Sequence, residues 1–255
     1  MLRNVKSLIG NAVLSTDGEI GIVDDLCFDS KMWGTAYVVI KVGGTASGGR
    51  AFLPPTALGK PDWERREFPV AYSKAQILGS PDLSIDMQAL RKKAQLRDEH
   101  PAMSFWTLSA DLAADGLLNT DANSDVDHLP SLNEDDPNLQ SANSVMRYRV
   151  QATDGKFGHI CDLVVDDSTW EIRYIVVATT QWLPGRRVVI SPHSVNRVSR
   201  MEEQVYVDLT QMMIKQSLEY ETPLPISEEY ESRLRDYYAS QSDNQGSRAM
   251  SVTFH

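Results

Sequence analysis

The chain repeats itself at a spacing of 137 residues, and this limits it to folds that are built twice. When the sequence is compared with itself at that offset, 16 of the 65 positions from 16 to 80 are identical without a gap. Average composition would give about four identities. The chain therefore contains two copies of one domain. The matches include Thr16-Asp17-Gly18 with Thr153-Asp154-Gly155, Asp25 with Asp162, Trp33 with Trp170, and Tyr37 with Tyr174.

A stretch between the copies carries the entire net charge of -10. Residues 98–136 contain ten acidic residues and no Lys or Arg. A run of like charges repels itself and stays solvated. We predict a first domain at 1–97, an acidic linker at 98–136, a second domain at 137–239 and a disordered tail at 240–255. Cleavage in the linker is then expected to release two folded fragments.

The pattern within each copy predicts β-structure. Asp-Gly at 17–18 and at 154–155 is a strong signal for a hairpin turn between apolar runs. Many short strands with regular turns favour a small closed barrel or a sandwich. Strands are expected at 20–28, 35–42 and 67–72 in the first copy, and at 157–165, 172–177, 188–190 and 204–209 in the second.

Short helices are expected to follow the strands of each copy. Ser73 and Thr210 stand at the position of a helix N-cap. A second, amphipathic helix is predicted at 227–239, with Tyr230, Leu234 and Tyr237 on one face. Its counterpart in the first copy is predicted at 87–97.

Composition excludes several classes of protein. No apolar run approaches the roughly 20 residues that a membrane span needs, and the N-terminal residues do not form a signal peptide. Two cysteines cannot build a disulfide framework. The excess of acidic residues disfavours nucleic acid as a partner, because phosphate binding needs clustered bases. We expect a cytoplasmic chain without a membrane span.

The second copy resembles the PRC-barrel family. The resemblance lies in ATDGKFGHICDLVVDDSTWEIRYIVV, WLPGRRVVISP, VYVDLT and YESRLRDYY, and it covers roughly 8–98 and 137–239. That family includes the cytoplasmic domain of the photosynthetic reaction-centre H subunit and a domain of a ribosome maturation factor. The resemblance implies two tandem small β-barrels, each followed by short helices. It also implies a module that docks on other macromolecules, related to the H subunit of electron-transfer complexes, with no catalytic residues or cofactor.

Several acidic residues have two interpretations. Asp25 and Asp162 recur in both copies, as do Asp29 and Asp166. Such carboxylates could relay protons if burial moved their pKa, as barrel-surface carboxylates of the H subunit assist proton delivery to a quinone. Alternatively they cap turns and bond loop amides. The run from Asp121 to Asp127 has oxygen ligands at alternate positions, but it lacks the Gly and Glu of a calcium loop, so we predict no metal site.

The candidate interaction surface lies on the second copy. It consists of Trp182, Arg186, Arg187 and His193, around the Pro184-Gly185 turn. Arg and Trp are enriched among interface anchors. The alternative is an aromatic ring packed on the barrel beside solvated arginines.

The sequence as a whole predicts a non-enzymatic module that docks on a protein partner; a homo-oligomer is compatible with it. One alternative is an RNA- or ribosome-associated maturation factor, which would need a basic face. A second is an enzyme, which would need a deep pocket with perturbed titratable groups.

We expect Trp182→Ala to weaken capture of the partner while thermal stability changes little. Truncating a tryptophan at an interface centre costs about 2 kcal/mol or more, a loss of roughly thirtyfold in affinity. Pull-down and thermal unfolding of the same variant test this. A drop of several degrees in melting temperature would instead place Trp182 in the core.

Overall fold

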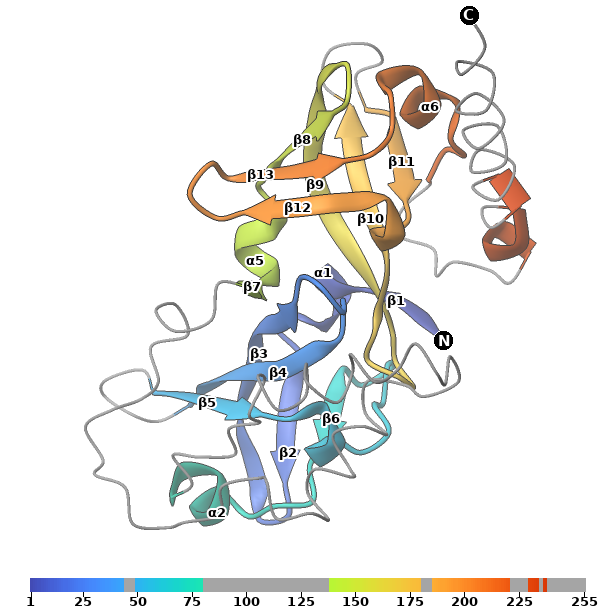
Figure 1. The fold of residues 1–255 in the computed structure, drawn as a ribbon. Helices are drawn as coiled ribbons and strands as arrows, with labels where there is room; N and C mark the ends of the chain where they lie inside the picture. The colour runs from blue at the N-terminus through green and yellow to red at the C-terminus, as the bar shows by residue number, and fades with distance from the viewer. Residues whose placement is uncertain (44–48, 80–137, 180–184, 221–228, 234–235, 238–255) are drawn as a thin grey trace, which may run out of the picture.

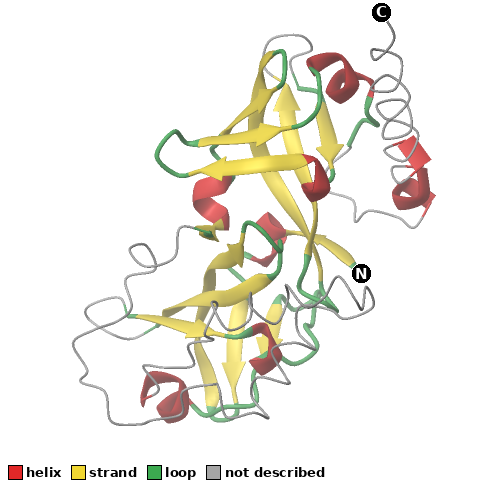
Figure 2. Cartoon of the chain, in the orientation of Figure 1, coloured by secondary structure: helices red, strands yellow, loops and turns green. Residues whose placement is uncertain are grey.

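The computed structural model describes residues 1–43, 49–79, 138–179, 185–220, 229–233 and 236–237. Within these residues the chain is mainly β, with short helices between strands (Figures 1 and 2). The strands form two separate mixed sheets, each drawn mostly from one half of the chain. The predicted class, a mainly β chain with two tandem units and short helices, is confirmed at this level.

The first sheet has the strand order β5-β4-β3-β2-β6. Neighbouring strands are antiparallel except for β2 and β6, which are parallel. The 3-10 helix η1 (Pro55–Ala57) follows β5, and helix α2 (Lys74–Gly79) follows β6. The strands are β2 (Ala12–Ser15), β3 (Gly18–Asp29), β4 (Thr35–Val42), β5 (Arg50–Leu53) and β6 (Glu67–Pro69).

The second sheet has the order β11-β10-β9-β8-β13-β12, with β8 and β13 parallel. The 3-10 helix η3 (Pro192–Ser194) follows β11, and helix α6 (Gln211–Gln216) follows β13. The strands are β8 (Arg149–Ala152), β9 (Gly155–Asp166), β10 (Ile172–Thr179), β11 (Arg187–Ile190), β12 (Val195–Ser199) and β13 (Gln204–Val207).

Each element of the first half begins 137 residues before its counterpart in the second. The long hairpin β2–β3 corresponds to β8–β9, and both turn at the predicted Asp-Gly. The predicted caps are also present, since Ser73 Oγ accepts the amide of Gln76 and Thr210 Oγ1 accepts that of Met213. The last strand of each half is shorter than predicted.

Barrel closure is not seen in the described residues. The hydrogen-bonded order ends at β5 and β6 in one sheet and at β11 and β12 in the other. Of the predicted helix at 227–239, residues 229–233 and 236–237 are helical. The predicted linker at 98–136, the helix at 87–97 and the tail at 240–255 lie outside the described residues.

Two short segments are exchanged between the halves. Strand β1 (Leu2–Asn4) and helix α1 (Val5–Leu8) begin the first half, yet β1 pairs with β9 of the second. Strand β7 (Leu139–Ser141) and helix α5 (Ala142–Val145) begin the second half, yet β7 pairs with β3 of the first. Figure 1 shows both crossings where the two sheets meet. Each sheet is thus completed by a strand from the other half.

The junction between the halves is centred on the two repeated tryptophans. The amide of Thr35 donates to the carbonyl of Trp170 at 2.9 Å, and the amide of Ile172 donates to that of Trp33 at 2.7 Å. The ring of Trp170 lies 6.2 Å from that of Phe68, in the first half. Buried apolar residues of both halves belong to one continuous cluster. The halves therefore share a core.

Both tryptophans have a left-handed backbone, with φ of 57° at Trp33 and 55° at Trp170. This conformation is unfavourable for a bulky residue and persists only where the surroundings impose it. Each tryptophan amide also donates to the carbonyl of the repeated aspartate four residues earlier. The tryptophan and the aspartate are thus identical in the two copies because the same turn, with its unfavourable backbone conformation, occurs in each half.

Two other repeated residues are explained by close backbone approach. A Cβ on Gly21 would lie 2.1 Å from the carbonyl oxygen of Lys41, and one on Gly158 would lie 2.2 Å from that of Ala178. No side chain fits there. The two glycines have equivalent partners, since Gly21 pairs with Val42 and Gly158 with Thr179.

We expect the halves to stay together when the chain is cut within 98–136. The exchanged strands and the shared core join the halves independently of the covalent connection, so from the structure we expect one particle where the sequence alone predicts two separate fragments. The measurement is size-exclusion chromatography with light scattering on protein cut at an engineered protease site. The cut protein should elute with the mass of the intact chain and separate into two fragments only in denaturant. Separate elution under native conditions at micromolar concentration would contradict this.

Candidate interaction site

The repeated aspartates Asp25 and Asp162 bind the exchanged segments. Asp162 accepts hydrogen bonds from Asn4 Nδ2 at 2.9 Å, from the amide of Lys6 at 3.2 Å and from the amide of Leu163 at 2.9 Å. Asn4 in turn accepts the hydroxyl of Tyr220 at 2.6 Å. Both carboxylate oxygens of Asp162 are thus engaged in holding residues 4–6 of the other half.

Asp25 makes the same arrangement at the other exchanged segment. It accepts hydrogen bonds from the hydroxyl of Ser141, the amide of Asn143 at 3.0 Å and the amide of Leu26 at 2.8 Å. Asn143 Nδ2 also donates to the carbonyl of Asp24 at 2.8 Å. Of the two interpretations of these carboxylates, the structure shows the second, in which they bond loop amides.

Burial raises the pKa of both carboxyl groups, and the hydrogen bonds from the exchanged segments partly oppose this. A carboxylate that is removed from water loses hydration, which favours its neutral form. The donors aimed at each oxygen favour the ionised form. Burial has the larger effect on the pKa at both sites.

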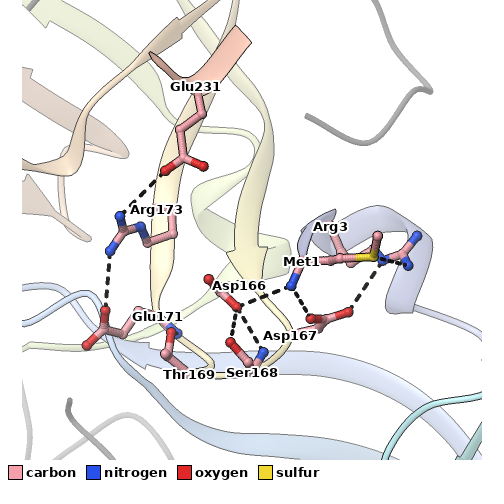
Figure 3. Close-up of polar contacts among 9 residues, drawn as sticks. All are labelled: Met1, Arg3, Asp166, Asp167, Ser168, Thr169, Glu171, Arg173 and Glu231. Atoms are coloured by element: carbon pink, nitrogen blue, oxygen red, sulfur yellow. Dashed lines mark hydrogen bonds and ion pairs between the residues drawn. The ribbon is translucent and has the colours of Figure 1, made fainter. Parts of the chain in front are cut away.

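The second repeated pair, Asp29 and Asp166, shapes the turns that carry the tryptophans. Asp29 Oδ1 accepts the amides of Lys31 and Met32, and Asp166 Oδ1 accepts the amide of Ser168 at 2.9 Å. Figure 3 shows the Asp166 turn facing the exchanged N-terminal segment. There Arg3 Nε lies 3.5 Å from Asp167 Oδ2, and the Met1 amino group lies 2.6 Å from Asp167 Oδ1. Asp29, Asp166 and Asp167 therefore also stabilise the turns and the N-terminal segment.

The structure describes three of the four predicted surface residues. Trp182 lies outside the described residues. Arg186 is half-buried, with Nη2 donating to the carbonyl of Ser217 at 3.2 Å and Nε 3.8 Å from Glu219 Oε2. Arg187 and His193 are exposed. Arg187 begins β11, whereas His193 lies in η3, which follows the other end of that strand. Arg186 thus holds residues 217–219 beside β11.

On the outer face of β9, β10 and β11 lie Leu218, Tyr220 and Tyr230. Its apolar residues form a second buried cluster, in which Tyr220 and the partly buried Tyr230 pack against the sheet. The amide of Tyr220 donates to the carbonyl of Arg187 at 2.8 Å, and burial raises the pKa of Tyr230 to about 12. Arg173 lies between Glu171 and Glu231, at 3.7 and 3.6 Å (Figure 3). The C-terminal helix therefore contacts the second sheet through Tyr230 and Glu231, while the Tyr237 hydroxyl donates to the carbonyl of Met213 in α6.

The hairpin between β12 and β13 carries an exposed surface that the sequence analysis missed. The Met201 residue at its tip is 98% exposed. Beside it, the Arg197 guanidinium lies 4.2 Å from the centre of the Tyr206 ring, and Glu202 Oε2 lies 3.1 Å from Arg197 Nη2. A comparison of the two copies indicates this surface, because the first half has Glu64 at the position that corresponds to Met201.

The residues that the structure describes contain no cluster of three or more His, Cys, Asp or Glu that could hold a metal ion. The candidate calcium run at 121–127 lies outside them. No helix among them is long and apolar enough to span a bilayer. Burial raises the pKa of the Cys27 and Cys161 thiols, which keeps both in the unreactive protonated form.

Comparison of the sequence with models of known protein families gave no match, and comparison with curated proteins gave none either. The fold and the site residues therefore have to be interpreted from this chain alone.

We expect Asp162→Asn to destabilise the protein more than Asp25→Asn does. In Asp162→Asn the new amide nitrogen faces Asn4 Nδ2, a second donor. If Asn4 reverses its amide, the Tyr220 hydroxyl must accept instead of donate, and its proton loses Asn4 Oδ1 as acceptor. A buried donor without an acceptor costs about 1–3 kcal/mol. In Asp25→Asn the new nitrogen faces the Ser141 hydroxyl, which can accept. Chemical denaturation gives the difference in the free energy of unfolding.

The matched control is Asn4→Ser combined with Asp162→Asn. It places at residue 4 the serine that the second half has at 141, so the new amide again finds an acceptor. We expect it to recover part of the stability that Asp162→Asn loses. Equal stability of the two single variants would contradict the geometry described above.

A pH series tests the raised pKa of Asp162. The unfolded group has the lower pKa, so the folded protein binds the proton more tightly. The favourable effect of protonation is complete below the unfolded pKa and disappears as the pH rises through the folded pKa. The stability of the wild type relative to Asp162→Asn should therefore fall as the pH rises from about 3.5 towards 7. Denaturation of both proteins at each pH measures this difference, and an increase with pH would contradict it.

Proposed function

We propose that this chain is a non-enzymatic docking protein of the PRC-barrel type, in which two barrel-like units present a surface to a protein partner. The proposal combines the resemblance of the second copy to that family with the mainly β, two-unit architecture. The docking surface belongs to the second half, and no cofactor takes part.

The observation that carries the proposal is the use of the repeated carboxylates. Asp25, Asp29, Asp162 and Asp166 are retained in both copies and could perform acid–base chemistry; Asp17 and Asp154 are retained as well and accept the amides of Lys74 and Gln211. Each accepts hydrogen bonds from backbone amides of the turns or exchanged segments. These groups therefore support the architecture, and the difference between the halves lies in their exposed residues.

The exposed residues that distinguish the second half are the candidate contacts. They include His193, where the first half has Thr56, and Met201, where it has Glu64. The predicted anchor Trp182 corresponds to Thr45. A methionine side chain adapts to varied apolar surfaces, which suits a contact residue. Arg186 is less suited to this role, because it already holds residues 217–219.

The experiment replaces second-half residues with their first-half counterparts. Trp182→Thr, His193→Thr and Met201→Glu are used to capture proteins from an extract of the source cells, with quantitative mass spectrometry. At least one variant should lose a specific partner by roughly tenfold or more, with unchanged thermal unfolding. Met212→Ala is the matched control, because Met212 is exposed on α6 and the first half has alanine there.

A second arm distinguishes protein docking from RNA association. The same capture is performed after treatment with ribonuclease. The partner should remain bound, since the chain is acidic and phosphate contacts need clustered bases. Loss of all partners on treatment would contradict the proposal and favour an RNA- or ribosome-associated role.

A further inference from the structure

The contacts between the two halves occur in equivalent pairs, one in each direction. The exchange of β1 onto β9 has its counterpart in the exchange of β7 onto β3. The bond from Thr35 to Trp170 has its counterpart in the bond from Ile172 to Trp33. In a two-fold dimer, a contact from one subunit to the other is always matched by the reverse contact. The two halves therefore meet through an interface of the homodimer type, contained in one chain.

None of these contacts depends on which chain provides each half. The exchanged segments pair through backbone hydrogen bonds and through Asp25 and Asp162, and both sets are complete whenever a first half meets a second half. The covalent connection between the described halves is the stretch 80–137, which is 58 residues long. Exchange of identical elements between chains is a low-cost route to dimers when such a connection allows it.

We propose that this interface also takes a second copy of the chain, forming a closed dimer in which the first half of each chain pairs with the second half of the other. The dimer contains the same junction twice and leaves no exchanged segment unpaired. This inference does not depend on the proposed docking function, because it concerns the junction and not the outer surface of the second half.

The length of the connection determines when each form appears. A tether between two sites gives an effective local concentration on the order of millimolar. Chains that fold at micromolar concentration therefore close on themselves, and chains that fold at hundreds of micromolar also pair with one another. Return from dimer to monomer requires withdrawal of β1 and β7 from their sheets and opening of the core around Trp33 and Trp170. The two forms should therefore interconvert only through unfolding.

The test begins with refolding from denaturant at about 2 and about 300 micromolar, followed by size-exclusion chromatography with light scattering. We expect monomer at the low concentration, and a dimer fraction at the high concentration that persists for hours after dilution. Monomer alone at both concentrations would overturn the proposal. A dimer that forms without unfolding and dissociates on dilution would also overturn it, because that behaviour indicates an ordinary surface contact.

A cut in the connection identifies the topology of the dimer. Chains with a C-terminal tag are refolded at high concentration with untagged, isotopically heavy chains, and both carry a protease site within 98–136. Cleavage of an exchanged dimer should halve its mass, and tag capture should then recover light second halves together with heavy first halves. An ordinary dimer would keep its mass, and tag capture from a mixed dimer would then recover heavy first halves and heavy second halves together.

Variants provide the matched comparison. Asp162→Ala removes the acceptor for residues 4–6, so it should lower the persistence of the dimer after dilution. Met212→Ala, on the exposed side of α6, should leave both the dimer fraction and its persistence unchanged. The reverse ranking would show that the dimer uses another surface. If Asp162→Ala fails to refold, the mass change on cleavage of the wild-type dimer still decides the proposal.

Discussion

The structure depends on two repeated carboxylates, the partly buried Asp25 and the buried Asp162, that each bind a segment from the opposite half. Asp162 holds the segment around Asn4, and Asp25 holds the segment around Ser141. An aspartate that is removed from water is costly unless donors surround it. At both sites backbone amides supply those donors, so the carboxylate and the exchanged segment stabilise each other. Loss of either one would leave the other without its hydrogen-bonding partners.

The contacts at the junction explain why some positions are identical in the two copies and others are not. The tryptophans need a left-handed backbone, an aspartate to shape the turn before them, and a partner strand that faces them from the opposite half. Strand positions that only fill the core vary freely in size between the copies, as Phe28 and Val165 do. Trp33 and Trp170 are identical, as are Gly21 and Gly158, whereas the left-handed pair Arg66 and Glu203 is not.

Local features could be predicted from the sequence, and long-range ones could not. The Asp-Gly turns, the strands around Tyr37 and Tyr174 and the caps at Ser73 and Thr210 depend on neighbouring residues. The exchange of segments depends on residues far away in the chain. The repeat gives little indication of it, because residues 2–8 and 139–145 share only Leu2 with Leu139 and Ser7 with Ser144. Asp25 and Asp162 stood out as repeated residues, but nothing nearby revealed that Asn4 and Ser141 would be their partners. Arg186 was expected on the surface and instead contacts a carbonyl that lies 31 residues further along the chain.

The exchanged strands also affect how the chain folds as it is synthesised. The bond from Asn4 to Asp162 joins residues 158 positions apart, and at roughly 5–20 residues per second the ribosome needs about 8–30 seconds to cover that interval. During this time strand β1 has no sheet to pair with. The edge of β3 is also unpaired until β7 has been synthesised. Contacts of such high sequence separation form slowly in any case. A nascent first half thus exposes an open strand edge for a predictable interval, and in that interval a chaperone or a neighbouring nascent chain can bind it.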